Sequence, residues 1–317
     1  MNNGPVAPAS IGGGQARFGV YFRRNLAGYL FVLPQILFIT VFILVPIVGA
    51  FYYSITNYNL LTAPEIADPI WKNFAALPGD ERYGPAIRNT LVFAFVTVPA
   101  GVITSLLLAQ LINRSIRGIY FFRAMFYMPV VSSFVAVSLI WLWFYEPQFG
   151  LFNEFLLWVG LPASKWLKGQ ESALLAIIVM SVWKNMGLNM VIYLAGLQGI
   201  PPTVIEAADI DGAGRVSKFL RIILPLLAPT TYFVVIVYFI GALQMFVQVW
   251  IMTQQPGNGV LTGGPLDSTV TVVLLIYSNA FEYLKMGYAA AMSVVLFLVI
   301  ALITYMNSRL LQYEVGW

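Results

Sequence analysis

The chain has 317 residues, of which 60% are hydrophobic and only 9% are charged. A soluble domain carries about 25% charged residues, so this deficit indicates that most of the chain lies in lipid. There is no cysteine and no histidine, which excludes disulfides, thiol chemistry and the commonest general base and metal ligand. The net charge of +4 suits basic loops at a lipid surface, and we expect no nucleic-acid partner.

The N-terminal segment differs in composition from the rest. Residues 1–25 are rich in Gly, Pro, Ala and Asn, so we predict a disordered tail ahead of a membrane domain over residues 26–317. The first apolar run begins near Leu26 and is too long for the core of a signal peptide. We therefore expect this run to remain in the protein as a membrane anchor.

Six apolar stretches follow, each about 20 residues or longer, which is the length that a helix needs to cross a bilayer. The predicted fold is an all-α polytopic membrane protein. Prolines within or at the ends of these stretches are read as local kinks, which membrane helices tolerate. The predicted spans are 26–53, 87–112, 120–145, 173–196, 222–252 and 286–308.

The loops set the expected orientation. One side of the membrane carries both termini and the 197–221 loop, and it holds ten of the 17 basic residues. The positive-inside rule places this side in the cytoplasm of a multi-pass protein of the cell (plasma or inner) membrane. The ten basic residues are Arg17, Arg23, Arg24, Arg114, Arg117, Arg123, Arg215, Lys218, Arg221 and Arg309.

The loop between the fourth and fifth spans contains a short polar helix. Thr203 and Glu206 have the spacing of a capping box, in which the two side chains satisfy the free amides of the first helical turn. Ala207 and Ala208 leave a helix face with almost no side chain, which can press into a groove on a partner. In the alternative interpretation, Glu206 is only a cap and the alanines are only good helix formers.

The spacing of the whole loop points to one family. The loop is similar to the one that marks the membrane subunits of ATP-binding-cassette importers. It contains Glu206-Ala-Ala, then three residues before Gly212, and then nine residues before Ile222-x-Leu-Pro225. The chain resembles the permease subunits of binding-protein-dependent sugar importers, specifically the maltose-permease-like first subunit. It has six predicted spans rather than eight and no large external insertion, so maltose itself is in doubt as the substrate.

The resemblance covers nearly the whole chain beyond the tail. Other stretches that match the family's pattern are Tyr29-Leu-Phe-Val-Leu-Pro34, Asn89-Thr90, Ala195-Gly-Leu-Gln-Gly-Ile-Pro201, Gly263-Gly-Pro265 and Gly287-Tyr-Ala-Ala-Ala291.

The resemblance implies the type I importer fold and a set of partners. These are a second permease subunit, expected to be a different chain, two cytoplasmic ATPase subunits and an extracytoplasmic binding protein that delivers a carbohydrate. The ATPases would hold ATP and Mg, so this chain has no cofactor of its own. It also lacks a Gly-rich loop ending in Gly-Lys-Ser/Thr, so we expect no ATP hydrolysis and no enzyme activity here. The expected ATPase contacts are Glu206, Ala207, Ala208, Asp211 and Gly212.

Polar residues in the fourth predicted span are candidates for the substrate pathway. Lys184 is the only charge well inside a span, which costs about 2.5–3.5 kcal/mol on insertion scales and marks a functional hypothesis by default. Lys184 could instead snorkel to an interface or pair with another subunit. Asn185 and Asn189 are four residues apart and therefore share one helix face.

The fifth predicted span supplies the other candidates. Tyr238, Gly241, Ala242, Met245 and Gln248 follow three- and four-residue steps along one face. In the maltose-type permeases the equivalent stretch lines the sugar site, although its side chains differ. Aromatic and amide groups suit a sugar, while single amides in membrane helices also bridge helices. One further candidate, Gln244, lies beside this face.

Three interpretations of function stay open at this stage. The first is an importer permease for a sugar oligomer or glycoside, with a glycerol-phosphate-type solute as the alternative substrate. The second is a self-sufficient secondary transporter, for which acidic residues within the spans and internal repeats would be expected. The third is an assembly subunit without a substrate path.

Overall fold

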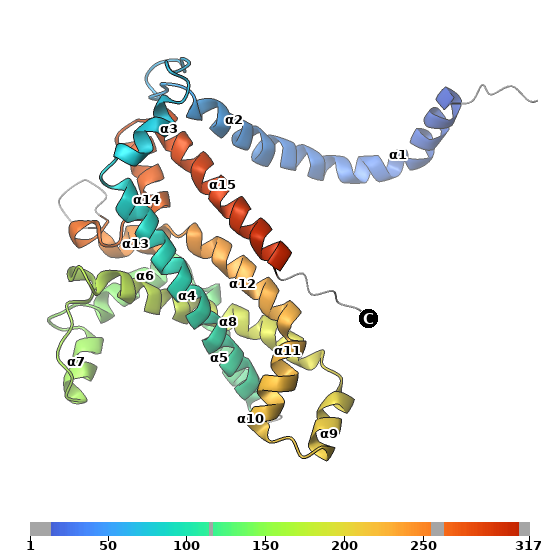
Figure 1. The fold of residues 1–317 in the computed structure, drawn as a ribbon, viewed down its shortest axis with the longest axis vertical. Coiled ribbons are helices and arrows are strands. Elements are labelled where there is room, and N and C mark those ends of the chain that lie inside the picture. The colour runs from blue at the N-terminus through green and yellow to red at the C-terminus, as the bar shows by residue number, and fades with distance from the viewer. Residues whose placement is uncertain (1–13, 114–116, 255–262, 311–317) are drawn as a thin grey trace, which may run out of the picture. The chain divides into compact units, whose positions relative to one another are not determined.

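The computed structural model describes residues 14–113, 117–254 and 263–310. It separates into two units, Met1–Tyr52 and Tyr53–Trp317, so the predicted single domain over 26–317 is divided near the end of its first span. Figure 1 gives the element labels used below. All regular elements in the described residues are helical, as predicted.

The first unit is one long apolar helical segment. It consists of α1 (Gly14–Ile39), the π-helical turn η1 (Thr40–Leu44) and α2 (Val45–Ser54), of which the last two residues belong to the second unit. The helix starts at Gly14, within the segment 1–25 for which we predicted a disordered tail. Gln15, Ala16 and Arg17 favour helix, and no proline separates them from the first span. Residues 1–13 lie outside the described residues.

The second unit contains the remaining helices. They are α3 (Lys72–Ala76), η2 (Leu77–Gly79), α4 (Tyr83–Ile112), α5 (Ile119–Val131), α6 (Phe134–Phe144), α7 (Leu151–Trp158), η3 (Trp166–Lys168), α8 (Ala173–Gln198), α9 (Pro202–Ile210), α10 (Arg215–Lys218), η4 (Phe219–Ile223), α11 (Leu224–Leu226), α12 (Ala228–Leu243), α13 (Val247–Thr253), η5 (Pro265–Asp267), α14 (Val272–Tyr277), η6 (Ser278–Glu282) and α15 (Met286–Leu310).

The core of this unit is built where α4 packs against α8 and α12. Small residues allow the close approach, as is usual between membrane helices. Gly101 on α4 faces the ring of Tyr238 on α12, and a side chain there would collide with the ring. Phe93 and Met180 are fully buried between α4 and α8. The packing therefore fixes the three helices that carry most of the candidate pathway residues.

The number of spans agrees with the prediction, but two of them are not straight. In the part of the chain that the structure describes, four helices are long and apolar enough to cross a membrane, and two bent pairs bring the count to as many as six. The predicted 120–145 span is broken between α5 and α6, which meet at 99°. The predicted 222–252 span bends by 67° at Leu227 and is interrupted again between α12 and α13. Pro229 has no N–H to continue the helical bonding across the bend.

The break between α5 and α6 is held by Lys184 on α8. Ser132 and Ser133 are extended, and the Ser133 side chain caps α6 by accepting from the amide of Val135. The Lys184 ammonium donates to the carbonyl of Pro129 at 2.9 Å and to that of Ser132 at 2.8 Å. It also lies 4.3 Å from the centroid of the Phe134 ring. The cation thus satisfies carbonyls at the negative end of the α5 dipole.

This geometry gives Lys184 a structural role, while its predicted pathway role stays a prediction. The residue is only 3% exposed, so it does not snorkel to an interface, and its ammonium is engaged by the chain's own backbone. The charge is present inside the span because a broken helix exposes acceptors that lipid cannot satisfy.

Two stretches that carried the family resemblance meet in space. The Asn89 amide donates to the carbonyls of Asp267 at 2.9 Å and Val270 at 3.0 Å. Arg82 binds the Asp267 carboxylate through two nitrogens, at 2.6 and 3.2 Å. The segment after Gly263-Gly264-Pro265 is therefore fixed to the start of α4, and Gly264 is left-handed at φ 74°.

The role of Lys184 can be tested by Lys184→Met, which keeps the apolar stem and removes the donor. We expect the free energy of unfolding in detergent to fall by about 1–3 kcal/mol, because buried carbonyls lose their partner. The matched control is Lys168→Met, since Lys168 forms an exposed ion pair with Glu146 and should change stability by less than about 1 kcal/mol. Equal thermal midpoints for the two variants would contradict the assignment.

Candidate functional site

The polar helix of the 197–221 loop is α9, but its N-terminus differs from the prediction. The helix begins at Pro202, with Pro201 as the N-cap and no side-chain cap bond. Thr203 is therefore already inside the first turn, and the predicted capping box with Glu206 is wrong. Proline is favoured at the first helical position because its φ is preset and its missing N–H would have no helical partner there. The helix therefore begins at Pro202 rather than after Thr203.

The C-terminus of α9 is closed by backbone hydrogen bonds around Gly212. Gly212 has φ 73°, in the left-handed region. Its amide donates to the carbonyl of Asp209 at 3.2 Å, and the amide of Ala213 donates to the carbonyl of Ala208 at 2.9 Å. These two bonds form a Schellman motif, which satisfies the last carbonyls of the helix and turns the chain sharply.

Some side chains of α9 are buried or paired within the chain, and others are exposed at its surface. Ala208 is only 4% exposed, so the bare face predicted for both alanines is available at Ala207 alone. Asp209 forms an ion pair with Lys218 of α10. Glu206 is exposed, and its carboxylate has no ion pair or hydrogen bond with the side chain of any other described residue. Asp211 is also exposed.

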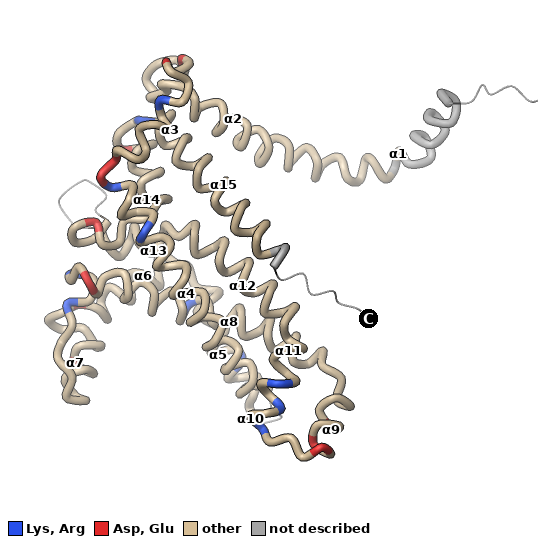
Figure 2. Tube along the Cα trace, viewed as in Figure 1, with Lys and Arg blue, Asp and Glu red and all other residues tan. Residues whose placement is uncertain are grey.

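Charge gathers at two ends of the second unit, around α9 and α10 and around α3 and the start of α4, while the long helices between them carry little of it (Figure 2). Basic residues Arg215, Lys218 and Arg221 lie within or just after α10. Arg114, which belonged to the predicted basic side, lies outside the described residues. The α9 helix therefore presents the unpaired carboxylate of Glu206 at the surface of this end of the second unit.

The second candidate site is a cavity of about 200 Å³ between α4, α6, α8, α12 and α13, called the polar cavity here because its mainly apolar wall contains several amide and hydroxyl groups. It brings together six of the nine predicted pathway residues, including Gln248, which reaches the cavity from α13 rather than from a continuous fifth span. The six are Asn185, Asn189, Tyr238, Gly241, Ala242 and Gln248.

Three predicted pathway residues are not part of this cavity. Lys184 holds the end of α5, as described above. Met245 is buried in the apolar core, and Gln244 is exposed at the interruption between α12 and α13. The helical spacing that placed Met245 on the same face as Tyr238 assumes a continuous helix, and the helix ends at Leu243.

The cavity also contains polar residues that the sequence analysis missed. Thr97 and Ser181 line it, and both are almost fully buried. The Thr97 and Ser181 hydroxyls and the Asn189 side-chain nitrogen have no hydrogen-bond partner among the described residues. Ser181 stands four residues before Asn185, a spacing that could have indicated it, whereas nothing in the sequence links Thr97 to this site. Unpaired buried groups suit a hydroxylated ligand that supplies both donors and acceptors.

The cavity does not have the residues of a metal or acid–base site. Within residues 14–113, 117–254 and 263–310 there is no group of three or more Asp, Glu, His or Cys side chains that could hold a metal ion. The cavity lining carries no carboxylate, and its polar groups are amides and hydroxyls. Such groups bind and orient the hydroxyl groups of a polar solute.

Comparison with known proteins identifies a family and several relatives that this chain resembles. The profile of the family described as "Binding-protein-dependent transport system inner membrane component" matches residues 89–312, which include α9 and the whole cavity. The chain is 34% identical to the probable ABC transporter permease protein YesP of Bacillus subtilis, over 93% of both chains. It is 31% identical to the arabinooligosaccharides transport system permease protein AraP of Bacillus subtilis, covering 98% of this chain and 96% of the relative.

Another relative and a solved structure extend the comparison. The sn-glycerol-3-phosphate transport system permease protein UgpA of Pectobacterium atrosepticum is 30% identical, over 93% of this chain and 97% of the relative. A bacterial ABC transporter involved in the import of the acidic polysaccharide alginate has the same fold, with a TM-score of 0.80 and 24% identity, over 95% of this chain and 100% of that chain. The type I importer permease fold is thereby confirmed.

The end of α9 gives a direct test of its geometry. A Cβ at Gly212 would meet no other atom within 4 Å, so the effect of a substitution there is conformational rather than steric. We expect Gly212→Val to destabilise the local turn by about 1–2 kcal/mol, whereas Gly212→Asn, which tolerates the left-handed region, should cost less. Amide hydrogen exchange of α9 measures this, and equal protection in both variants would contradict the Schellman assignment.

Proposed function

Because the chain belongs to the family of binding-protein-dependent transport system inner membrane components, we propose that it forms half of the translocation pathway of an ATP-driven carbohydrate importer. It is a multi-pass membrane protein and a transport permease. The observation that supports coupling to an ATPase is α9. This helix begins at a proline, is closed at its C-terminus by a Schellman motif and displays the unpaired Glu206 carboxylate between two membrane segments.

In this proposal α9 is the coupling helix that docks on a cytoplasmic ATPase subunit. Glu206 would accept a basic group of that subunit, and Ala207 would allow close approach of the two backbones. Asp211 and Gly212 border the same contact, while the buried Ala208 supports it from within the chain. The ATPase would bind ATP and Mg, and ATP-driven closure would move α9 together with the helices attached to it.

The proposed assembly contains a second permease subunit, two ATPases and an extracytoplasmic binding protein. The basic residues around α10 favour a cytoplasmic location for α9 and for both termini. The cavity of about 200 Å³ in this chain is smaller than the roughly 300–1,000 Å³ of a typical ligand site. A pathway shared by two permeases would supply the missing volume.

A carbohydrate is the substrate class that the cavity supports best. The Tyr238 ring offers an apolar face, and the unpaired Thr97, Ser181 and Asn189 groups match hydroxyls. The relative AraP is described as a permease for arabinooligosaccharides. A glycerol-phosphate-type solute is the second candidate, favoured by the similarity to the sn-glycerol-3-phosphate permease UgpA.

Two other classes of function have less support. A secondary transporter would need ionisable groups to carry the coupling ion through the bundle. The described lining of the cavity has none, and Lys184 is bound to backbone carbonyls. A mere assembly subunit would leave the unpaired polar groups of the cavity without a purpose.

Reconstitution separates these classes. The full chain should copurify with an ATPase subunit and a second permease, and the ATPase activity should rise when the solute-loaded binding protein is added. Solute uptake by vesicles that contain this chain alone would instead identify a secondary transporter. An ATPase that copurifies but ignores the loaded binding protein would identify an assembly subunit.

The docking contact can be tested by Glu206→Gln and Ala207→Trp. Since Glu206 forms no cap bond, Glu206→Gln removes a charge without altering the helix end. We expect several-fold lower ATPase stimulation in Glu206→Gln, the effect of one lost charge-assisted bond, and loss of the copurifying ATPase in Ala207→Trp.

Matched controls for the docking test lie on other exposed helices. They are Glu154→Gln on α7 and Ala75→Trp on α3, which change the same residue types away from α9. The docking proposal fails if the two α9 variants couple and copurify as well as these controls.

The cavity can be tested by Asn189→Leu, which replaces a buried amide by an apolar group of similar size. We expect substrate-stimulated transport to fall several-fold, because a hydrogen bond to the solute is lost, while assembly with the partners is unchanged. The control is Val191→Leu on an exposed face of the same helix. Normal transport and specificity in Asn189→Leu would remove this residue from the pathway.

A further inference from the structure

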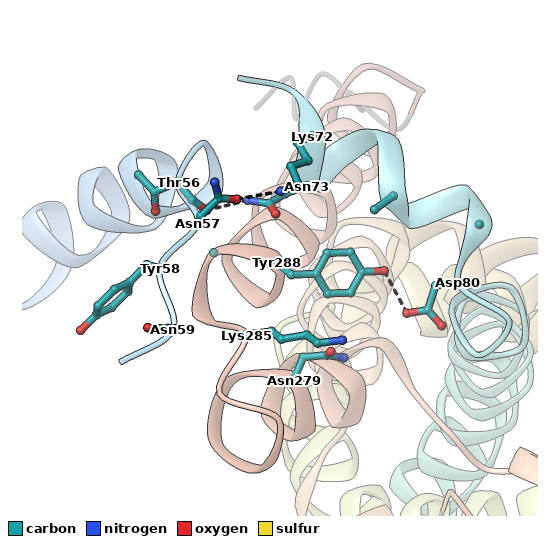
Figure 3. Close-up of a pocket in the computed structure, with 13 residues that line it drawn as sticks. Thr56, Asn57, Tyr58, Asn59, Lys72, Asn73, Asp80, Asn279, Lys285 and Tyr288 are labelled. Carbon is teal, nitrogen blue, oxygen red and sulfur yellow. Dashed lines mark hydrogen bonds between the residues drawn. The ribbon is translucent and has the colours of Figure 1, made fainter. Parts of the chain in front are cut away.

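A second, larger pocket lies at the other end of α4 from α9 (Figures 1 and 3). It encloses about 550 Å³, within the roughly 300–1,000 Å³ of small-molecule sites. Its walls come from the segment after α2, from α3 and η2, and from the junction of η6 with α15. In the proposed orientation this end faces away from the cytoplasm.

The walls of this outer pocket are fixed by hydrogen bonds. The buried Asn73 amide donates to the carbonyls of Ser54 at 2.9 Å and Thr56 at 2.8 Å. The amide of Gly287 donates to the carbonyl of Tyr58 at 2.9 Å, and a side chain at Gly287 would collide with the Thr56 carbonyl. The pocket is thus preorganised, which lowers the entropic cost of binding a ligand.

The charges that line the pocket are unbalanced. Lys72 and Lys285 contribute two ammonium groups, and neither has an ion pair with any described residue. The one carboxylate, Asp80, is already engaged: its oxygens accept from the Arg82 amide and from the Tyr288 hydroxyl, both at 2.9 Å. The pocket therefore presents net positive charge to a ligand.

The uncharged residues that line the pocket indicate which other groups a ligand would carry beside its anionic group. Figure 3 shows Lys285, Asn279 and Tyr288 extending in the same direction from the start of α15 and the turn before it. An ammonium beside an amide and an aromatic ring can bind an anionic group together with hydroxyls and apolar C–H faces. Across the pocket, Lys72 lies beside Asn57, whose side-chain oxygen it meets at 3.4 Å.

We propose that this outer pocket binds the anionic group of a polyhydroxylated solute, a carboxylate or a phosphate, before the solute enters the bundle. The proposal rests on the proposed transport function for its direction, and it deepens that function by naming an acidic sugar or sugar phosphate as the substrate class. A solute is favoured over an acidic protein side chain, because both lysines line a hollow large enough for a sugar residue.

Binding is measured on the full chain in lipid nanodiscs, without any partner, by saturation-transfer NMR. The probes form two pairs, D-glucuronate with D-glucose and glycerol 3-phosphate with glycerol. We expect the charged member of at least one pair to bind several-fold more tightly than its neutral partner, and the responding pair tells a carboxylate from a phosphate. Lys285→Met and Lys72→Met should each weaken that binding by about tenfold, a loss of roughly 1.4 kcal/mol.

Lys168→Met is the matched control, since Lys168 is paired with Glu146 away from the pocket, and it should bind as the unaltered chain does. Equal binding of charged and neutral probes, or unchanged binding in both pocket variants, would overturn the proposal. A second measurement adds the binding protein to the same nanodiscs: lysine variants that weaken only its attachment, with probe binding unchanged, would show that the pocket docks this protein and that the solute proposal is wrong. Because no ATPase takes part, this outcome is independent of the reconstitution test.

Discussion

A helix that breaks inside a membrane exposes carbonyl groups that lipid cannot satisfy, and the second unit depends on how this chain meets that demand. At the end of α5 the demand is met by Lys184, whose ammonium bonds the carbonyls of Pro129 and Ser132 and lies against Phe134. The charge that looks most anomalous in the sequence thus permits a 99° change of direction. The contact therefore helps to set the direction of α6, which also packs against α13.

The interruptions of the third and fifth spans together create the polar cavity. α6 turns at Ser132 and Ser133 and packs against α13, which exists as a separate helix because the chain is interrupted after Leu243. Phe134 and Gln248 reach the cavity from these two short helices, while α4, α8 and α12 supply its remaining walls. Irregular backbone at membrane depth is tolerated where it lines a cavity or is buried in protein, and both conditions are met here.

Features that depend on local sequence could be predicted, whereas features that depend on contacts between distant helices could not. The turn at Gly212 and the presence of a helix before it follow from the conformational preference of one residue, so they were predictable. Amides in an apolar span are conspicuous in a sequence, and six of the nine pathway candidates line one cavity, where their role in the pathway stays a prediction. The capping box was predicted wrongly because Pro202 competes for the helix start. The role of Lys184 and the burial of Ala208 depend on helices distant in the chain, which periodicity cannot register.

In the proposed coupling mechanism, α8 is the element that joins the two candidate sites. It runs without proline for 26 residues and ends four residues before α9 begins. The same helix carries Asn185 and Asn189 in the cavity wall and Lys184 beneath the break of α5. A straight helix transmits displacement along its axis, whereas α5 and α12 adjoin bends that absorb it. A shift of α9 would therefore reach the cavity amides and the Lys184 contact together, so that the opening of the polar cavity and the direction of α6 change in one step.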